Sequence, residues 1–157
     1  MKYGIKKIVF VTLIFILSAC QSIYYKLPAG APLEDSTTLV GSKVFTQNIL
    51  LYNNEITYVL AIDDLPVKGR LWKNYSNPIK LLPGKHVVQI ANKQGTLFAK
   101  VSFELNVQSR KRYIARGEVL DRENVRMWIE DNEENKVTKI LVVPRINSSF
   151  GGGFIFI

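Results

Sequence analysis

The chain has 157 residues, of which 47% are hydrophobic and 22% are charged, a balance that favours a folded domain over a disordered chain. Its formal net charge is +8, and a single cysteine excludes an internal disulfide. One histidine and one cysteine are also too few for a usual structural zinc site, so we expect no metal and no cofactor.

The first 19 residues have the three-part pattern of a secretory signal peptide. A basic start with three lysines is followed by an apolar run over residues 8–17. That run is shorter than the roughly 20 residues of a membrane-spanning helix. The segment ends in a small-residue cleavage motif directly before the cysteine: Leu17, Ser18, Ala19 and then Cys20.

This motif resembles the lipobox of bacterial lipoproteins. The resemblance implies a thioether-linked diacylglycerol on Cys20, cleavage before it, and acylation of the new amino terminus. Each buried methylene contributes about 0.8 kcal/mol, so two or more acyl chains anchor a protein durably. In Gram-negative members, aspartate next to the cysteine favours the inner membrane. Gln21 stands there instead, which favours the periplasmic face of the outer membrane. A Gram-positive envelope, a free thiol and an uncleaved anchor are the alternatives.

Cleavage after Ala19 would leave 138 residues with a side-chain charge of +5, a length that suits one domain. Residues 20–38 contain two prolines and a glycine without periodicity, and they predict the lipidated cysteine and a tether. Tyr24 and Tyr25 would lie at the headgroup layer or pack on the domain. The basic excess fits anionic envelope partners or mere solubility, and the export signal argues against nucleic acid.

From residue 39 to 145 the hydrophobic pattern has a period of two, so we predict an all-β fold, an antiparallel β-sandwich of about seven strands or a small barrel. The clearest strand spans residues 96–107, where six alternate positions are apolar. Further strands are predicted, in chain order, at 39–45, 49–52, 55–62, 79–82, 85–91, 113–120, 125–130 and 137–143.

Three connections complete this prediction. In residues 55–62, Ile56, Tyr58, Leu60 and Ile62 would share one face of the strand. The Pro83-Gly84 turn would return the chain from 79–82 into 85–91 as a hairpin. A last hairpin would join 125–130 to 137–143 around an acidic loop, and residues 71–75 would form an edge strand or a loop.

Two stretches resemble the strand–turn–strand core of PEGA-type modules. These are Ala61-Ile62-Asp63-Asp64-Leu65-Pro66-Val67 and Leu81-Leu82-Pro83-Gly84-Lys85-His86-Val87-Val88. Tyr113-Ile114-Ala115 is similar to a strand of related small envelope lipoproteins. The resemblance spans residues 56–130 and implies a β-sandwich used as a structural or binding module without catalytic residues. The sequence departs from the pattern at Asp63-Asp64-Leu65, where Asp-Gly-Lys is more usual.

The remaining chemistry argues against an enzyme. The single histidine, His86, has no Gly-x-Ser-x-Gly elbow to serve, so we interpret it as a sheet residue beside a turn. The acidic loop at residues 130–134 lacks the residue order of a calcium loop and fits a solvated hairpin tip. Asp63-Asp64 fits a turn better than a catalytic carboxylate pair, because adjacent strand residues point to opposite faces.

Three groups are candidates for binding. A basic turn, Arg110, Lys111, Arg112 and Arg116, would contact anionic headgroups, solubilise the protein, or pair with the acidic hairpin loop. Trp72 and Tyr75 would stack on a sugar or peptide, or cover the sandwich. The Gly-rich tail, 146–157, ends in an apolar run with Phe154 and Phe156, which would fold back or complete another protein's sheet. The sequence thus predicts an envelope accessory module with a protein partner, or a module for glycan or lipid headgroups.

Overall fold

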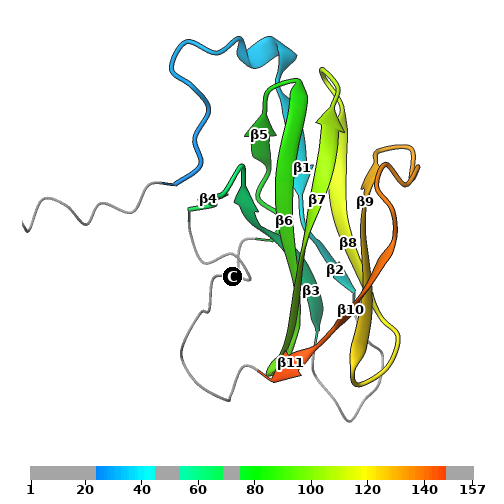
Figure 1. Ribbon diagram of the computed structural model, residues 1–157. Helices are drawn as coiled ribbons and strands as arrows, with labels where there is room; N and C mark the ends of the chain where they lie inside the picture. The colour runs from blue at the N-terminus through cyan, green and yellow to red at the C-terminus, as the bar shows by residue number, and fades with distance from the viewer. Residues whose placement is uncertain (1–23, 45–53, 69–74, 148–157) are drawn as a thin grey trace, which may run out of the picture.

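The computed structural model describes residues 24–44, 54–68 and 75–147, which form two β-sheets packed face to face (Figure 1). The predicted all-β sandwich is therefore confirmed. Sheet A has the order β10-β9-β8-β1-β5. Its strands are β1 (Thr37–Val40), β5 (Ile79–Leu81), β8 (Arg112–Val119), β9 (Asn124–Asp131) and β10 (Leu141–Pro144).

Sheet B has the order β11-β7-β6-β3-β2, with β4 paired to β3. Its strands are β2 (Ser42–Val44), β3 (Glu55–Ile62), β4 (Leu65–Pro66), β6 (Gly84–Gln94), β7 (Leu97–Val107) and β11 (Ile146–Asn147). A short 3₁₀ helix, Leu33–Asp35, precedes β1. All strand pairs in the described ranges are antiparallel except β1 with β8, which is parallel.

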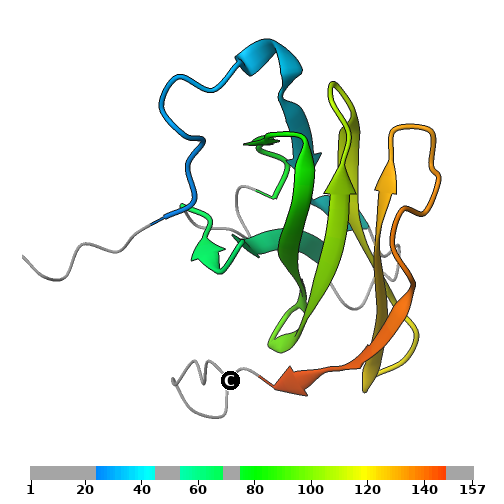
Figure 2. The ribbon, with the colours of Figure 1, turned by 45° about the horizontal axis from the view of Figure 1, so that its top comes forward.

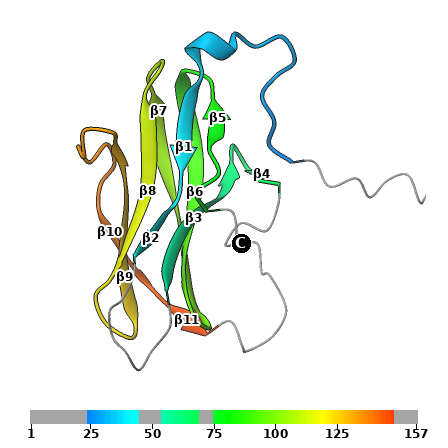
Figure 3. The same ribbon diagram turned by 180° about the vertical axis from the view of Figure 1, so that it is seen from behind.

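The described part of the chain has eleven strands rather than about seven, partly because the chain passes almost directly from one sheet into the other at β1–β2 and at β10–β11. The predicted strand at 39–45 was wrong as a single element: it divides at Gly41, where β1 of sheet A gives way to β2 of sheet B (Figure 3). A Cβ at Gly41 would lie 2.2 Å from the backbone oxygen of Thr57. Only glycine lets the chain cross here. At the other end, β10 crosses from sheet A into β11 of sheet B (Figure 2).

The β6–β7 hairpin is the central pair of sheet B and follows its sequence pattern closely. Eleven residue pairs join the two strands, from Gly84 opposite Val107 to Gln94 opposite Leu97. Along β7, Phe103, Leu105 and Val107 are buried while the residues between them are exposed, so the predicted alternation is confirmed. A one-residue slip would expose this whole set, which is why the register is well specified.

Two predicted details of neighbouring strands were wrong. Residues 79–82 and 85–91 do not pair with each other: β5 pairs with β1 in sheet A, and β6 lies in sheet B. The Pro83-Gly84 turn therefore connects the sheets instead of closing a hairpin. In β3, the register shifts between Val59 and Ala61, a β-bulge that breaks strict alternation. As a result Val59 and Ile62, predicted on opposite faces, both reach the core.

The last hairpin also differs from its prediction. Its second strand begins at Leu141 rather than at residue 137. Residues 137 and 138 instead hold the loop against β9: the Val137 N–H donates to the Ile129 carbonyl at 2.9 Å, and the Thr138 hydroxyl accepts from the Ile129 N–H at 2.9 Å. A side-chain hydroxyl thus takes a position that a sheet ladder would otherwise fill.

The core lies between the sheets and is almost wholly apolar. Its fully buried members come from both sheets and include Leu39, Ile62, Leu81, Ile90, Met127 and Ile129. Burying each such side chain contributes about 1.5–3 kcal/mol. Of the predicted tether, Thr37 already belongs to β1, and Tyr25 packs against the core. Of the predicted tail, Ile146–Asn147 forms β11, which pairs with Phe98 and Leu97 of β7.

Candidate functional site

Several predicted site residues lie outside the described part of the chain. These are the cleavage motif with the lipidation site and three aromatic candidates: Leu17, Ser18, Ala19, Cys20, Trp72, Phe154 and Phe156. The four basic candidates and Tyr75 lie inside it. The structure does not bring Tyr75 together with the basic residues, because none of them lines the hollow that Tyr75 lines.

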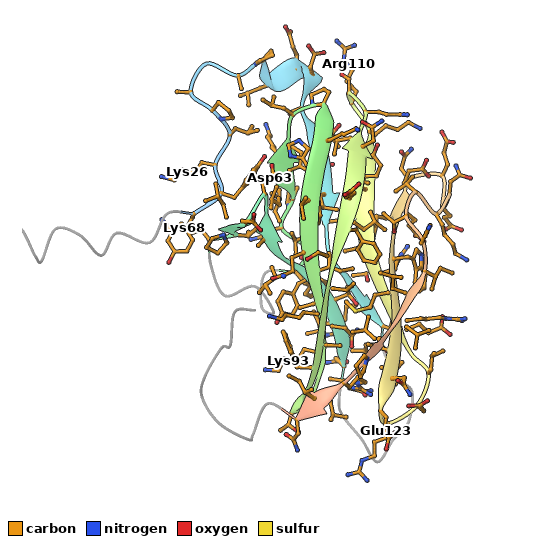
Figure 4. The ribbon with its side chains drawn as sticks, viewed as in Figure 1. Lys26, Asp63, Lys68, Lys93, Arg110 and Glu123 are labelled. Atoms are coloured by element: carbon orange, nitrogen blue, oxygen red, sulfur yellow. The ribbon has the colours of Figure 1, made fainter. Side chains whose placement is uncertain are left out.

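The basic turn between β7 and β8 is largely neutralised by acidic neighbours. Arg110, labelled in Figure 4, lies 3.4 Å from the carboxylate of Asp35, the last residue of the 3₁₀ helix. Lys111 lies 3.7 Å from the Asp131 carboxylate and 3.9 Å from that of Glu133, so the acidic hairpin loop is its partner. Within the described ranges, Arg112 alone of these cations has no ion pair. This pairing leaves little positive charge for anionic headgroups.

Arg116 belongs to a separate network on the outer face of sheet A, which also contains Trp128. Its Nε donates to Oε1 of Glu130 at 2.6 Å, and the Trp128 indole donates to the other oxygen at 3.1 Å. Lys136 lies 5.7 Å from the centre of the Trp128 ring. Sequence reasoning missed Trp128, although its place between Arg126 and Glu130 on alternate residues marks an outward-facing position.

The acidic hairpin loop is organised by one carboxylate rather than by solvent alone. Oδ1 of Asp131 accepts the backbone N–H groups of Glu133 at 2.9 Å and Asn135 at 3.0 Å. Burial by itself would raise the pKa of Asp131, but these hydrogen bonds and Lys111 hold it below the usual range. No group of three or more potential metal ligands occurs among the residues that the structure describes.

His86 holds two turns together. Its Nδ1 lies 2.7 Å from Oδ2 of Asp63, and its Nε2 lies 2.9 Å from the carbonyl oxygen of Leu82. The other Asp63 oxygen accepts the Val87 N–H at 2.9 Å. Asp63 itself has a φ of +49°, in the left-handed region. Its carboxylate ties this turn to the His86 side chain and to the Val87 backbone. These contacts tie the Asp63 turn to the turn at Leu82.

A buried polar cluster closes one end of the sandwich. The Asn92 amide donates to Glu55 Oε1 at 2.9 Å and to the Thr57 hydroxyl at 3.0 Å. All three residues are nearly inaccessible to solvent. Burial raises the pKa of Glu55, an effect that the Asn92 amide, the Val119 N–H and the charge of Arg145 partly offset.

The strand β10 forms one open edge of sheet A. Arg145 donates its backbone N–H to the Glu123 carbonyl at 2.7 Å. This pair lies two residues beyond the pair of Val143 with Val125 and continues the same register. Alternate residues therefore direct their backbone groups to β9, and the N–H and C=O of Val142 point outward. Val142 is 60% exposed. Other exposed apolar side chains lie close to it in the chain: Val137, Ile140, Leu141 and Ile146.

Tyr75 lines a hollow of about 250 Å³ on the far side of the molecule from β10, together with Tyr25 and Tyr58. We refer to it as the tyrosine pocket. The Tyr75 backbone oxygen accepts the Gly41 N–H at 2.7 Å, which fixes Tyr75 against the β1–β2 crossing.

Within the described residues, no helix has both the length and the apolar character needed to cross a bilayer. Comparison of the chain with protein-family models, with curated proteins and with solved structures found no match.

Proposed function

We propose that this chain is a lipid-anchored protein of the bacterial envelope that acts as a non-enzymatic accessory module for an envelope protein. The anchor part of the proposal rests on the signal-peptide pattern and on the lipobox-like motif that ends at Cys20. The partner part rests on a single observation, the open edge of sheet A at β10.

An open edge strand presents unpaired backbone groups to any extended segment that approaches it. Here the outward N–H and C=O belong to Val142, and the neighbouring exposed side chains are apolar. Pro144 at the end of the strand has no N–H, which limits pairing to a short stretch. These features favour a short apolar partner strand, added to sheet A by β-augmentation, over open-ended aggregation.

The position of this edge suits a tethered protein. The first described segment packs along the opposite side: Tyr25 bonds to the Pro66 carbonyl of β4 at 2.9 Å and to the Lys80 carbonyl of β5 at 3.3 Å. In sheet A, β5 and β10 are the two outer strands, and Figure 1 shows them on opposite sides of the sandwich. A chain held through its N-terminal segment would therefore keep β10 directed away from the tether.

Two substitutions at one position test the partner proposal. Val142→Pro removes the outward N–H without breaking the β9 ladder, whereas Val142→Thr keeps that donor and the β preference. We expect affinity capture of the full chain from detergent-solubilised envelopes to recover an envelope protein that Val142→Pro loses and Val142→Thr retains. Equal recovery with both variants would refute the edge as the docking site.

The anchor proposal has its own test. Cys20→Ser should leave the protein unacylated and move it from the membrane to the soluble or unprocessed fraction. Metabolic labelling with a fatty-acid analogue checks this directly. Label that persists in the Cys20→Ser variant would contradict the lipobox assignment.

A further inference from the structure

The tyrosine pocket lies where the two sheets approach each other at their β5 and β3–β4 edges. Three tyrosines from distant parts of the chain line it, with Val67, Lys68 and Asn77 beside them. The Tyr25 N–H donates to the Pro66 carbonyl of β4 and its hydroxyl donates to the Lys80 carbonyl of β5, so the ring is fixed across these two strands. Lys68 and Lys26, both labelled in Figure 4, extend into solvent on this side of the molecule. The pocket is thus built by side chains that the fold holds in place.

Tyr58 is the unusual member of this lining. It is only 6% exposed, yet no hydrogen bond within the described residues engages its hydroxyl. Burial alone raises the pKa of Tyr58 to about 12, so the hydroxyl keeps its proton at physiological pH. Because no described residue pairs with it and Tyr58 lines the pocket, the protonated hydroxyl is a donor available to an occupant.

The remaining lining restricts the chemistry of that occupant. Tyrosine rings offer flat apolar faces with a polar edge, and the Asn77 amide can both donate and accept hydrogen bonds. No carboxylate is among the described residues that line the pocket, and Lys68 places one positive charge there. A volume of about 250 Å³ is slightly below the roughly 300–1,000 Å³ of pockets that hold drug-sized ligands. The space suits one ring with its substituents.

We propose that the tyrosine pocket binds a single sugar ring of an envelope glycan, stacked on Tyr75 and hydrogen-bonded to the Tyr58 hydroxyl and the Asn77 amide. An acyl chain fits less well, because it would cover the Tyr58 hydroxyl without satisfying it. Lys68 favours a sugar that carries an acidic substituent. The site is distinct from the β10 edge, so it gives the module a second, independent point of attachment.

Titration calorimetry of the full chain in detergent micelles tests this directly. The probes are soluble tetrasaccharides of glucose, N-acetylglucosamine and glucuronic acid. We expect at least one to bind, with the glucuronic acid probe tightest. Tyr58→Phe, which removes only the hydroxyl, should weaken binding about 3- to 10-fold through the lost hydrogen bond. Tyr75→Ala should weaken it about 10-fold or more, because the ring face and its apolar contact area are lost. Tyr24→Phe is the matched control and should bind normally, because Tyr24 is exposed and outside the pocket.

Three results would overturn the proposal. The first is the absence of binding to all three tetrasaccharides at millimolar concentration. The second is binding that Tyr58→Phe and Tyr75→Ala leave unchanged. The third is binding to phosphatidylglycerol vesicles without binding to any saccharide, which would identify an anionic headgroup as the ligand. Because Val142 variants leave the pocket intact, failure here and failure of the edge proposal are separately visible.

Discussion

Replacing Gly117 by alanine should destabilise the protein through the buried polar cluster. Gly117 lies in β8, facing sheet B across the sandwich. A Cβ added there would lie 2.4 Å from the Thr57 hydroxyl oxygen and 2.6 Å from the Asn92 amide nitrogen. Both side chains are essentially inaccessible, at 1% and 0% exposure, so neither can move into solvent to make room.

The magnitude follows from two contributions. Overpacking a tight core by one methyl group typically costs about 1–3 kcal/mol. Moving the Asn92 amide also weakens its two hydrogen bonds, each with a net contribution of about 0.5–1.5 kcal/mol. We therefore expect Gly117→Ala to lower the free energy of unfolding by about 2–5 kcal/mol, a large part of the 5–15 kcal/mol typical of a domain.

Urea denaturation followed by circular dichroism measures this change, with Cys20→Ser as the background so that no lipid interferes. The sign alone is decisive. Without a clash, alanine in a strand is more favourable than glycine by about 0.5–1 kcal/mol. A double-mutant cycle with Thr57→Ala, which removes the nearer atom, should show a combined loss smaller than the sum of the single losses by at least about 1 kcal/mol. Unchanged or increased stability of Gly117→Ala would refute the close approach.

Three further predictions concern stability. Because burial raises the pKa of Glu55 in the folded state, the native protein binds this proton more tightly than the unfolded chain does. The wild type should therefore lose stability relative to Glu55→Gln as the pH rises through and above 4.5. A difference in unfolding free energy between the two proteins that stays constant from pH 4 to pH 8, measured by urea denaturation, would contradict this. His86→Ala removes the contacts to Asp63 and Leu82 and should cost about 1–3 kcal/mol in unfolding free energy, with thermal melting as the assay. Asp63→Asn should cost less than about 0.5 kcal/mol, because an amide still accepts the Val87 N–H and tolerates a positive φ; a loss equal to that of His86→Ala would show that the charge is essential.

The sequence predicts best where side-chain alternation and burial coincide. In β7, one apolar face and one polar face fix both the strand and its register. The prediction fails where backbone geometry decides. The division at Gly41 depends on a backbone approach to Thr57 and Tyr75 that no local pattern encodes. The bulge near Leu60 likewise shifts faces without any change in hydrophobicity.

The site residues follow the same division. Pairing of Lys111 with the acidic loop was one of three readings of the charge pattern, and the structure selects it for that residue. The tyrosine pocket could not be predicted, because Tyr25, Tyr58 and Tyr75 meet only after β3, β4 and β5 are in place. The outward direction of the Val142 backbone depends on the β9–β10 register, which the predicted hairpin at 137–143 did not give.

Site-specific photo-crosslinking in intact cells tests the central proposal most directly. A photoreactive amino acid would replace Val142 on the β10 edge in one variant and Val87 in the other. Val87 is also exposed, at 42% against 60% for Val142, but it lies on β6 between two paired strands, so it has no open edge to offer. Our account predicts a defined crosslinked envelope protein from position 142 that is absent from position 87. Identical products from both positions, or none from 142 in correctly localised protein, would contradict it.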